Sequence, residues 1–210
     1  MFGLSICEYP GCQKPALFVP GAAEFPEYGG VFCFRHTPDA EFWAGKIIRF
    51  ILNNEKIVGI NVSGLEFKNL DLSGKRFYGC SFQNCSFTDV TAEKIRVRLS
   101  VFDFAGFTDC RFNNADMHFA SFAGARIKQT SFVGSDLFHS NFSGITTERS
   151  TFNDSDLYNS RFIRAELTDT SIVNCNITNT NFLGLIQRNV SFKSSNTKEA
   201  IFSESMEKKR

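Results

Sequence analysis

The chain has 210 residues, of which 42% are hydrophobic and 21% charged, with a formal net charge of +1. This balance excludes a nucleic-acid or membrane-surface partner held by electrostatics alone, and no apolar run is long enough for a transmembrane helix. The first residues, MFGLSICEYPGC, lack the basic stretch of a secretory signal. We therefore expect a cytoplasmic protein whose seven cysteines are thiols or metal ligands rather than disulfides.

Residues 1–37 keep no repeat but carry a metal-ligand pattern. Cys7 and Cys12 flank a Pro-Gly turn, and 20 residues later come Cys33 and His36. Two short-spaced ligand pairs joined by a loop are typical of a tetrahedral Cys3His zinc site. Because all four positions are protein side chains, we expect structural rather than catalytic zinc. The alternative is three unrelated buried thiols and a surface histidine.

Residues 38–55 are predicted to form a helix. Thr37 is a plausible N-cap and Pro38 suits the first helical position. One face of the predicted helix is apolar, with Trp43, Ile47, Phe50 and Ile51. A DNA-contacting zinc finger would need a basic recognition helix, whereas this segment has only Lys46 and Arg49 as basic residues.

From Val62 to Phe202 the sequence repeats every five residues without an insertion or deletion. Of the 29 central positions in this register, 25 are Phe, Leu, Ile, Met or Val. Two residues before each centre, 22 of the 29 are small (Ala, Cys, Ser, Thr or Val), and two residues after it, 18 are Gly, Asn or Asp. Neither a helix nor a long strand keeps this period. A chain that turns a corner every five residues does, with Gly, Asn or Asp at the corner.

Four such sides close a square coil of 20 residues, so 29 units predict about seven stacked coils. Phenylalanine should then stack on phenylalanine in the column that contains Phe82, Phe102, Phe122, Phe142, Phe162, Phe182 and Phe202. Cys80, Cys85, Cys110 and Cys175 occupy the small inward position and are predicted to be packing residues. Lys75 also falls at this position and departs from the pattern.

The repeat, in units such as ASFAG, SNFSG and AELTD, resembles the pentapeptide-repeat proteins over residues 60–204. The resemblance implies an all-β fold, a right-handed quadrilateral β-helix. We expect a zinc-binding module at 1–37, a helix at 38–55 that caps the first coil, the β-helix at 56–204 and a tail at 205–210. A cap is expected because an open solenoid end exposes unpaired strand edges.

One side of the coil, centred on residues 77, 97, 117, 137, 157 and 177, carries outward aromatic and acidic side chains. We name it the aromatic face. Outward aromatic residues often mark binding surfaces. The alternative for its aspartates is a structural role, since Asp before the centre is common in this family. The candidate partner-binding residues are Tyr78, Asp116, His118, Phe119, Asp136, Phe138, His139, Asp156 and Tyr158.

The C-terminal coil has no evident cap in the sequence. Large apolar residues lie at outward positions there, beside the end of a phenylalanine column, which suggests a homodimer through this end. Several family members dimerise in this way. The alternative is that the tail folds over the edge. The candidate residues are Leu183, Ile186, Ile201 and Phe202.

The sequence shows no nucleophile–base pair and no phosphate-binding loop, so an enzyme is not expected. We expect a protein-interaction or scaffold protein that contacts a protein partner rather than nucleic acid or membrane. The alternative is a DNA-mimicking modulator of a type II topoisomerase, as some family members are. Those rely on an acidic rod, whereas residues 60–204 contain 15 Lys and Arg and 15 Asp and Glu. Arg76, Arg96 and Arg98 also flank the acidic residues of the aromatic face.

Overall fold

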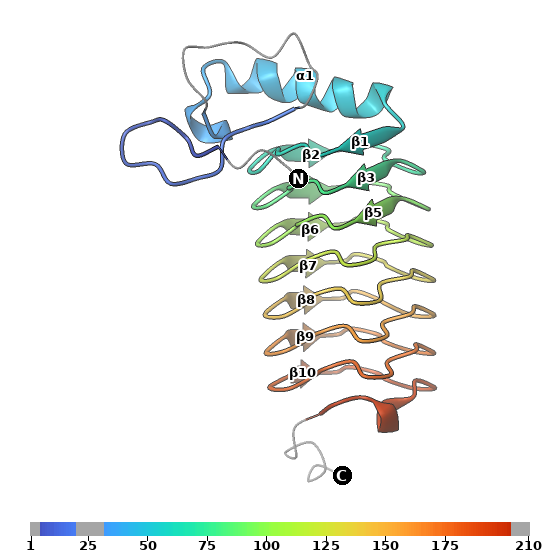
Figure 1. Cartoon of the computed structure of the whole chain (residues 1–210). Coiled ribbons are helices and arrows are strands. Elements are labelled where there is room, and N and C mark those ends of the chain that lie inside the picture. Colours follow the sequence, from blue (N-terminus) through green and yellow to red (C-terminus); the bar gives the residue numbers. More distant parts are fainter. Residues whose placement is uncertain (1–4, 20–31, 203–210) are drawn as a thin grey trace.

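The computed structural model describes residues 5–19 and 32–202. Within them the chain winds into a parallel β-helix of about seven coils, as predicted. Each residue pairs with the residue 20 positions later, as in the bridges from Ser81 to Val101 and from Val101 to Ser121. Because each side takes five residues, the coil has four sides. Figure 1 shows the coils stacked in one column, with a helix lying across the N-terminal end.

Two sides of the coil contain regular strands, all paired in parallel. The smaller sheet consists of β1 (Lys56–Val58), β3 (Arg76–Tyr78) and β5 (Arg96–Arg98). The larger sheet, in spatial order from β2 to β10, consists of β2 (Glu66–Lys68), β4 (Ser86–Thr88), β6 (Gly106–Thr108), β7 (Arg126–Lys128), β8 (Thr146–Glu148), β9 (Glu166–Thr168) and β10 (Ile186–Arg188). After β5 the smaller sheet continues as single-residue bridges through Asp116, Asp136 and Asp156.

The corners lie where the sequence predicts them. From Gly59 to Ser194, every residue two positions after a centre has a positive φ. Gly, Asn and Asp tolerate this left-handed conformation, which explains their enrichment. At Gly124 a side chain is excluded as well, because a Cβ atom there would lie 2.7 Å from the ring of Phe104.

Stacked phenylalanine rings fill the interior. Along the column from Phe82 to Phe202, successive rings are stacked with centroids 4.8–5.1 Å apart, which confirms the predicted ladder. Each buried ring removes a large apolar area from water, worth roughly 25 cal/mol per Å². Each coil therefore depends on the coils above and below it.

Small side chains between the ladders satisfy buried backbone carbonyls. The hydroxyl of Ser135 donates to the carbonyl oxygen of Phe112 at 2.7 Å, and the thiol of Cys85 donates to that of Val62 at 3.2 Å. Burial raises the pKa of Cys85 to about 12, so this thiol stays neutral. The repeat cysteines are thus buried packing residues that also act as donors.

Helix α1 (Ala40–Asn53) lies across the first coil and buries Trp43, Ile47 and Ile51. It starts at Ala40 rather than at the predicted Pro38, because the N-cap residue Asp39 has a left-handed φ of 52°. In the preceding 3-10 turn, η1 (Phe34–His36), the hydroxyl of Thr37 donates to the carbonyl oxygen of Cys33. A second 3-10 turn, η2 (Thr197–Glu199), lies near the other end.

The structure also explains Lys75, the charged residue at a small inward position. Its ammonium group donates to the carbonyl oxygens of Leu52 and Asn54, at 2.8 and 3.0 Å. These carbonyls lie at the C-terminus of α1, where a cation is favourable. Lys75 therefore joins the helix to the second coil.

We predict that Phe142→Ala, which removes a fully buried ring from the middle of the ladder, lowers the free energy of unfolding by about 3–5 kcal/mol. The measurement is urea unfolding followed by circular dichroism. Phe202→Ala is the matched control, since Phe202 ends the same ladder and is only half-buried. Equal losses in the two variants would contradict the interdependence of neighbouring coils.

Candidate metal site and interaction face

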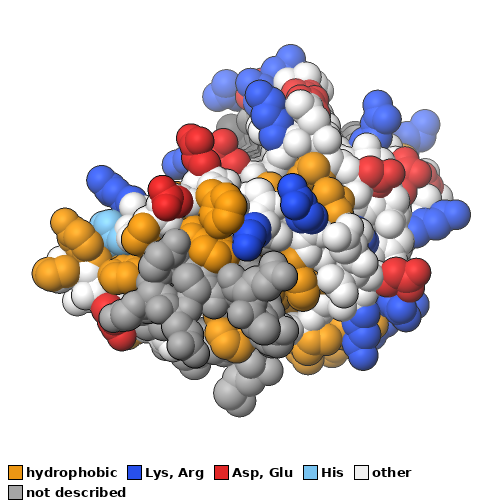
Figure 2. Space-filling view, turned by 90° about the horizontal axis from the view of Figure 1, so that it is seen from above, with side chains coloured by type: hydrophobic (Ala, Val, Ile, Leu, Met, Phe, Trp, Pro, Cys, Tyr) orange, Lys and Arg blue, Asp and Glu red, His pale blue; other side chains and the backbone are white. Residues whose placement is uncertain are grey.

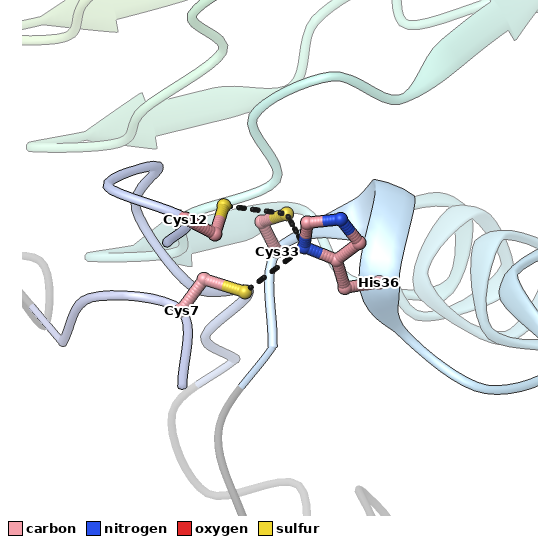
Figure 3. A group of neighbouring side chains, drawn as sticks. All are labelled: Cys7, Cys12, Cys33 and His36. Carbon is pink, nitrogen blue, oxygen red and sulfur yellow. Dashed lines mark hydrogen bonds between the residues drawn. The ribbon is translucent and has the colours of Figure 1, made fainter. Parts of the chain in front are cut away.

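Four potential metal ligands converge beside the first coil. Cys7 and Cys12 come from the N-terminal segment, whereas Cys33 and His36 come from the start and end of the η1 turn (Figure 3). Nδ1 of His36 lies 3.4 Å from Sγ of Cys7 and 3.6 Å from Sγ of Cys33. Sγ of Cys12 lies 3.9 Å from Sγ of Cys33. All four ligand atoms lie within 4.8 Å of one another.

Local backbone turns bring each pair together. In the first pair, the amide of Cys12 donates to the carbonyl oxygen of Tyr9, and Gly11 supplies a φ of +78°. In the second, the amide of His36 donates to the carbonyl oxygen of Cys33 at 2.9 Å. The ring of Tyr9 stacks on that of His36, with centroids 3.9 Å apart, and so orients the imidazole. Tyr9 stands between the first two cysteines but was not among the predicted site residues.

These separations fit a tetrahedral metal centre. With metal–sulfur and metal–nitrogen bonds of about 2.3 and 2.0 Å, tetrahedral geometry puts two sulfurs about 3.8 Å apart, and sulfur and nitrogen about 3.5 Å apart. Cys7 and Cys33 are buried, at 4% and 3% exposure, which keeps water away from their side. The residues present therefore form a Cys3His cluster that could hold a metal ion.

The pKa values of the two buried thiols of the cluster are shifted in opposite directions. Burial alone would raise the pKa of Cys7, but hydrogen bonds from the backbones of Cys33 and Tyr9 and from His36 outweigh it and lower this pKa to about 6. Burial, together with the neighbouring sulfurs of Cys7 and Cys12, raises the pKa of Cys33. One thiolate is thus ready to bind a cation, and a bound cation would favour ionisation of the others.

The N-terminal segment is hydrogen-bonded to the β-helix. Phe18 and Asn61 exchange two backbone hydrogen bonds, at 2.8 and 2.7 Å, in an antiparallel bridge. The side-chain amide of Asn61 donates to the carbonyl oxygen of Ala16, and Val19 packs into the core. Residues of this segment and α1 therefore cover the edge of the first coil together.

On the aromatic face, the three predicted aspartates occupy successive coils and form a continuous line of backbone bridges. Asp116 accepts hydrogen bonds from Arg96 and Arg98, at 3.0 and 2.7 Å. His118 is 8% exposed, and its Nε2 lies 2.6 Å from a carboxylate oxygen of Asp136. His118 is thus buried beside the carboxylates of Asp116 and Asp136 and leaves little surface for a partner.

The other aromatic residues of this face differ in exposure. Phe119 is 50% exposed and stacks on His139 at 5.0 Å, and Tyr158 is 39% exposed. Phe138 lies over His118, with centroids 3.7 Å apart, and Tyr78 is half-buried beneath the ammonium group of Lys56.

The sequence analysis missed Leu99, which is 67% exposed at the corner one coil before Phe119. A count of the corners that lack Gly, Asn and Asp would have found it.

At the C-terminal end, Leu183, Ile186 and Ile201 are exposed, whereas Phe202 is half-buried against Phe182. The predicted tail and residues 203–204 lie outside the described residues. Viewed from the capped end, Lys and Arg side chains intermingle with Asp and Glu around the rim (Figure 2). No helix among the described residues is long and apolar enough to cross a membrane.

Comparisons with solved structures find proteins of the same kind. HetL from the cyanobacterium Nostoc sp. strain PCC 7120 is 13% identical, with a TM-score of 0.28, over 76% of this chain and 97% of that one. QnrB1, a plasmid-mediated fluoroquinolone resistance protein, is 16% identical, with a TM-score of 0.38, over 73% and 84%. Rfr23 from the cyanobacterium Cyanothece 51142 is 10% identical, with a TM-score of 0.30, over 77% and 99%. These values carry no conclusion about function.

No curated protein matches the chain. A family model described as pentapeptide repeats matches eight copies, over residues 100–144 and 148–184. Together with the five-residue sides and left-handed corners, this match identifies the chain as a pentapeptide-repeat protein.

Proposed function

We propose that this protein is a non-enzymatic interaction scaffold whose aromatic face contacts a protein partner and whose N-terminal cap contains structural zinc. The observation that carries the zinc proposal is the set of ligand separations, 3.4–3.9 Å, which match a tetrahedral site. Three sulfurs and one imidazole nitrogen suit zinc better than calcium or magnesium, which prefer oxygen ligands.

The zinc proposed here is structural. Four protein ligands complete a tetrahedron and leave no position for a substrate. The cluster joins two segments that are 20 residues apart in the chain, and the first of them is bonded to the first coil through Phe18 and Asn61. Zinc would therefore stabilise the cap that protects the first strand edge from association with other chains.

The interaction proposal rests on the exposed residues of the aromatic face. Leu99, Phe119 and Tyr158 are 67%, 50% and 39% exposed. Exposed aromatic side chains on one side of a rigid solenoid are typical of binding surfaces, because they bury a large area without much loss of conformational freedom. Charge disfavours the DNA-mimicking alternative, since the repeat region holds equal numbers of acidic and basic residues.

We further propose a contact between two copies through the C-terminal coil. Ile186 and Ile201 are 63% and 47% exposed there, and Gln187 takes the central position of β10, where it is exposed as well. An open coil with apolar side chains at its rim is suited to association with a second such end.

We predict that the protein purifies with one equivalent of zinc and that replacing Cys33 and His36 with Ala removes it. Native mass spectrometry measures the bound metal. Cys110→Ala is the control, because Cys110 lies in the repeat at a position that Ala fills in other coils, so this variant should keep its zinc. Unchanged zinc in the first variant would show that the site is assigned wrongly.

For the aromatic face, we predict that Phe138→Ser combined with Tyr158→Ser removes the protein captured from the native host by the purified chain. Phe104→Ser is the control, since Phe104 is 66% exposed at a different corner. If the unmodified chain, the double variant and the control all recover the same partners, this face is not the binding surface. Inhibition or protection of gyrase by micromolar protein in a supercoiling assay would favour the alternative.

For the C-terminal end, we predict that Ile186→Ser combined with Ile201→Ser reduces the molar mass measured by light scattering after size-exclusion chromatography. The two substitutions place hydroxyls at exposed positions, so the fold should be kept, as circular dichroism would show. An unchanged mass would contradict a contact through this end.

A further inference from the structure

The charges of the aromatic face form two halves of opposite sign. From the second coil to the sixth, the residues before the centres are Arg76, Arg96, Asp116, Asp136 and Asp156. Of the inner residues, Arg96 and Asp116 are ion-paired within the molecule, and a carboxylate oxygen of Asp136 lies 2.6 Å from Nε2 of His118. At the outer positions, Arg76 lies 3.4 Å from the exposed carboxylate of Glu55. Asp156 accepts hydrogen bonds from the amide of Tyr158 and the side chain of Asn176, and has no ion-pair partner among the described residues.

The corners at the other edge of this face, two residues after the centres, carry side chains that are unfavourable in a monomer. Leu99, Phe119 and His139 have φ values of 52°, 55° and 57°. The left-handed conformation costs about 1–2 kcal/mol for residues with a bulky side chain, and Asn or Asp would lower this cost. Leu99 and Phe119 also expose apolar surface to water. Burial of Leu99 and Phe119 in a complex would remove this apolar surface from water.

We infer that the aromatic face binds the same face of a second copy, with the two solenoids antiparallel about a two-fold axis through the coil of Met117. A two-fold axis parallel to the strands reverses the order of the coils. Each outward row of side chains then faces the same row of the second copy. Arg76 then faces Asp156 of the second copy, Tyr78 faces Tyr158, and the ring of Phe119 faces its own equivalent.

The symmetry is consistent with the length of the solenoid. The coil of Met117 is the fourth of the seven between Ile57 and Ile177, so the two sides overlap over their whole length. In a parallel arrangement, the row of Arg and Asp residues would instead face the row that contains Tyr78 and Tyr158. Arg76 would then not meet Asp156 of the second copy. Charge complementarity therefore selects the antiparallel partner.

This inference rests on the proposed function, because it names a second copy as the protein that contacts the aromatic face. Seven coils at about 4.8 Å spacing give a side roughly 30 Å long and narrow. Its area is below the standard interface of about 1,600 Å², so we expect association in the micromolar range.

Charge reversal on opposite ends of the face tests the inference. All chains carry Ile186→Ser and Ile201→Ser, so that a contact through the C-terminal end does not contribute. Sedimentation equilibrium from about 1 to 200 μM should show association of this parent. Arg76→Asp and Asp156→Arg should each lower the association constant at least about tenfold, because like charges then face each other. An equimolar mixture of the two variants should associate as the parent does.

Phe119→Asn tests the centre of the interface without harming the fold, since Asn suits a left-handed corner. Its association constant should fall at least about tenfold. The matched control is Phe104→Asn, because Phe104 has a φ of 59° and is 66% exposed on another corner. Association of this control should be unchanged, and circular dichroism should show the same fold in every variant.

A parent that stays monomeric, or a mixture that associates no better than either charge variant alone, would overturn the inference. The proposed function would survive that outcome if Phe138→Ser with Tyr158→Ser still prevented capture of a different protein. Restored association in the mixture would support the antiparallel arrangement, because an end-to-end contact does not pair Arg76 with Asp156.

Discussion

The backbone corner at every fifth residue is the constraint on which the rest of this structure depends. A residue in the left-handed conformation ends each short side and turns the chain onto the next one, from Gly59 to Ser194. Since no residue is inserted, every side chain lies directly above its counterpart 20 residues earlier. The phenylalanine ladders, the hydrogen bonds of the small side chains and the line of aspartates are all results of this register.

Much of the fold could be predicted because its rule is local. The five-residue period gives the coil, the ladder from Phe82 and the packing role of the repeat cysteines, and all of these are present. Helix α1 starts at Ala40 rather than at the predicted Pro38, because Asp39 takes a left-handed conformation that the residue types at 37–41 did not indicate. The partners of Lys75 lie on another element, so periodicity alone did not indicate them.

The sequence predicted which residues belong to the candidate sites better than it predicted their contacts and exposure. Spacing within each Cys and His pair indicated the Cys3His cluster, since a tight turn brings such pairs together. The stacking of Tyr9 on His36 needed the folded geometry. On the aromatic face, the register predicted which residues share a side, but not their exposure. His118 is buried between carboxylates and Leu99 is exposed, because side-chain direction depends on neighbours in adjacent coils.

The bond between Phe18 and Asn61 has a consequence for how the molecule is made. A chain leaves the ribosome from its N-terminal side, so the metal cluster and α1 emerge before the coils that they cover. The first coil can then pack on these segments as soon as Asn61 has emerged, and each later coil can add to the one before it and is stabilised further by the coil that follows. Folding can therefore keep pace with synthesis, 20 residues at a time, with just one growing edge exposed.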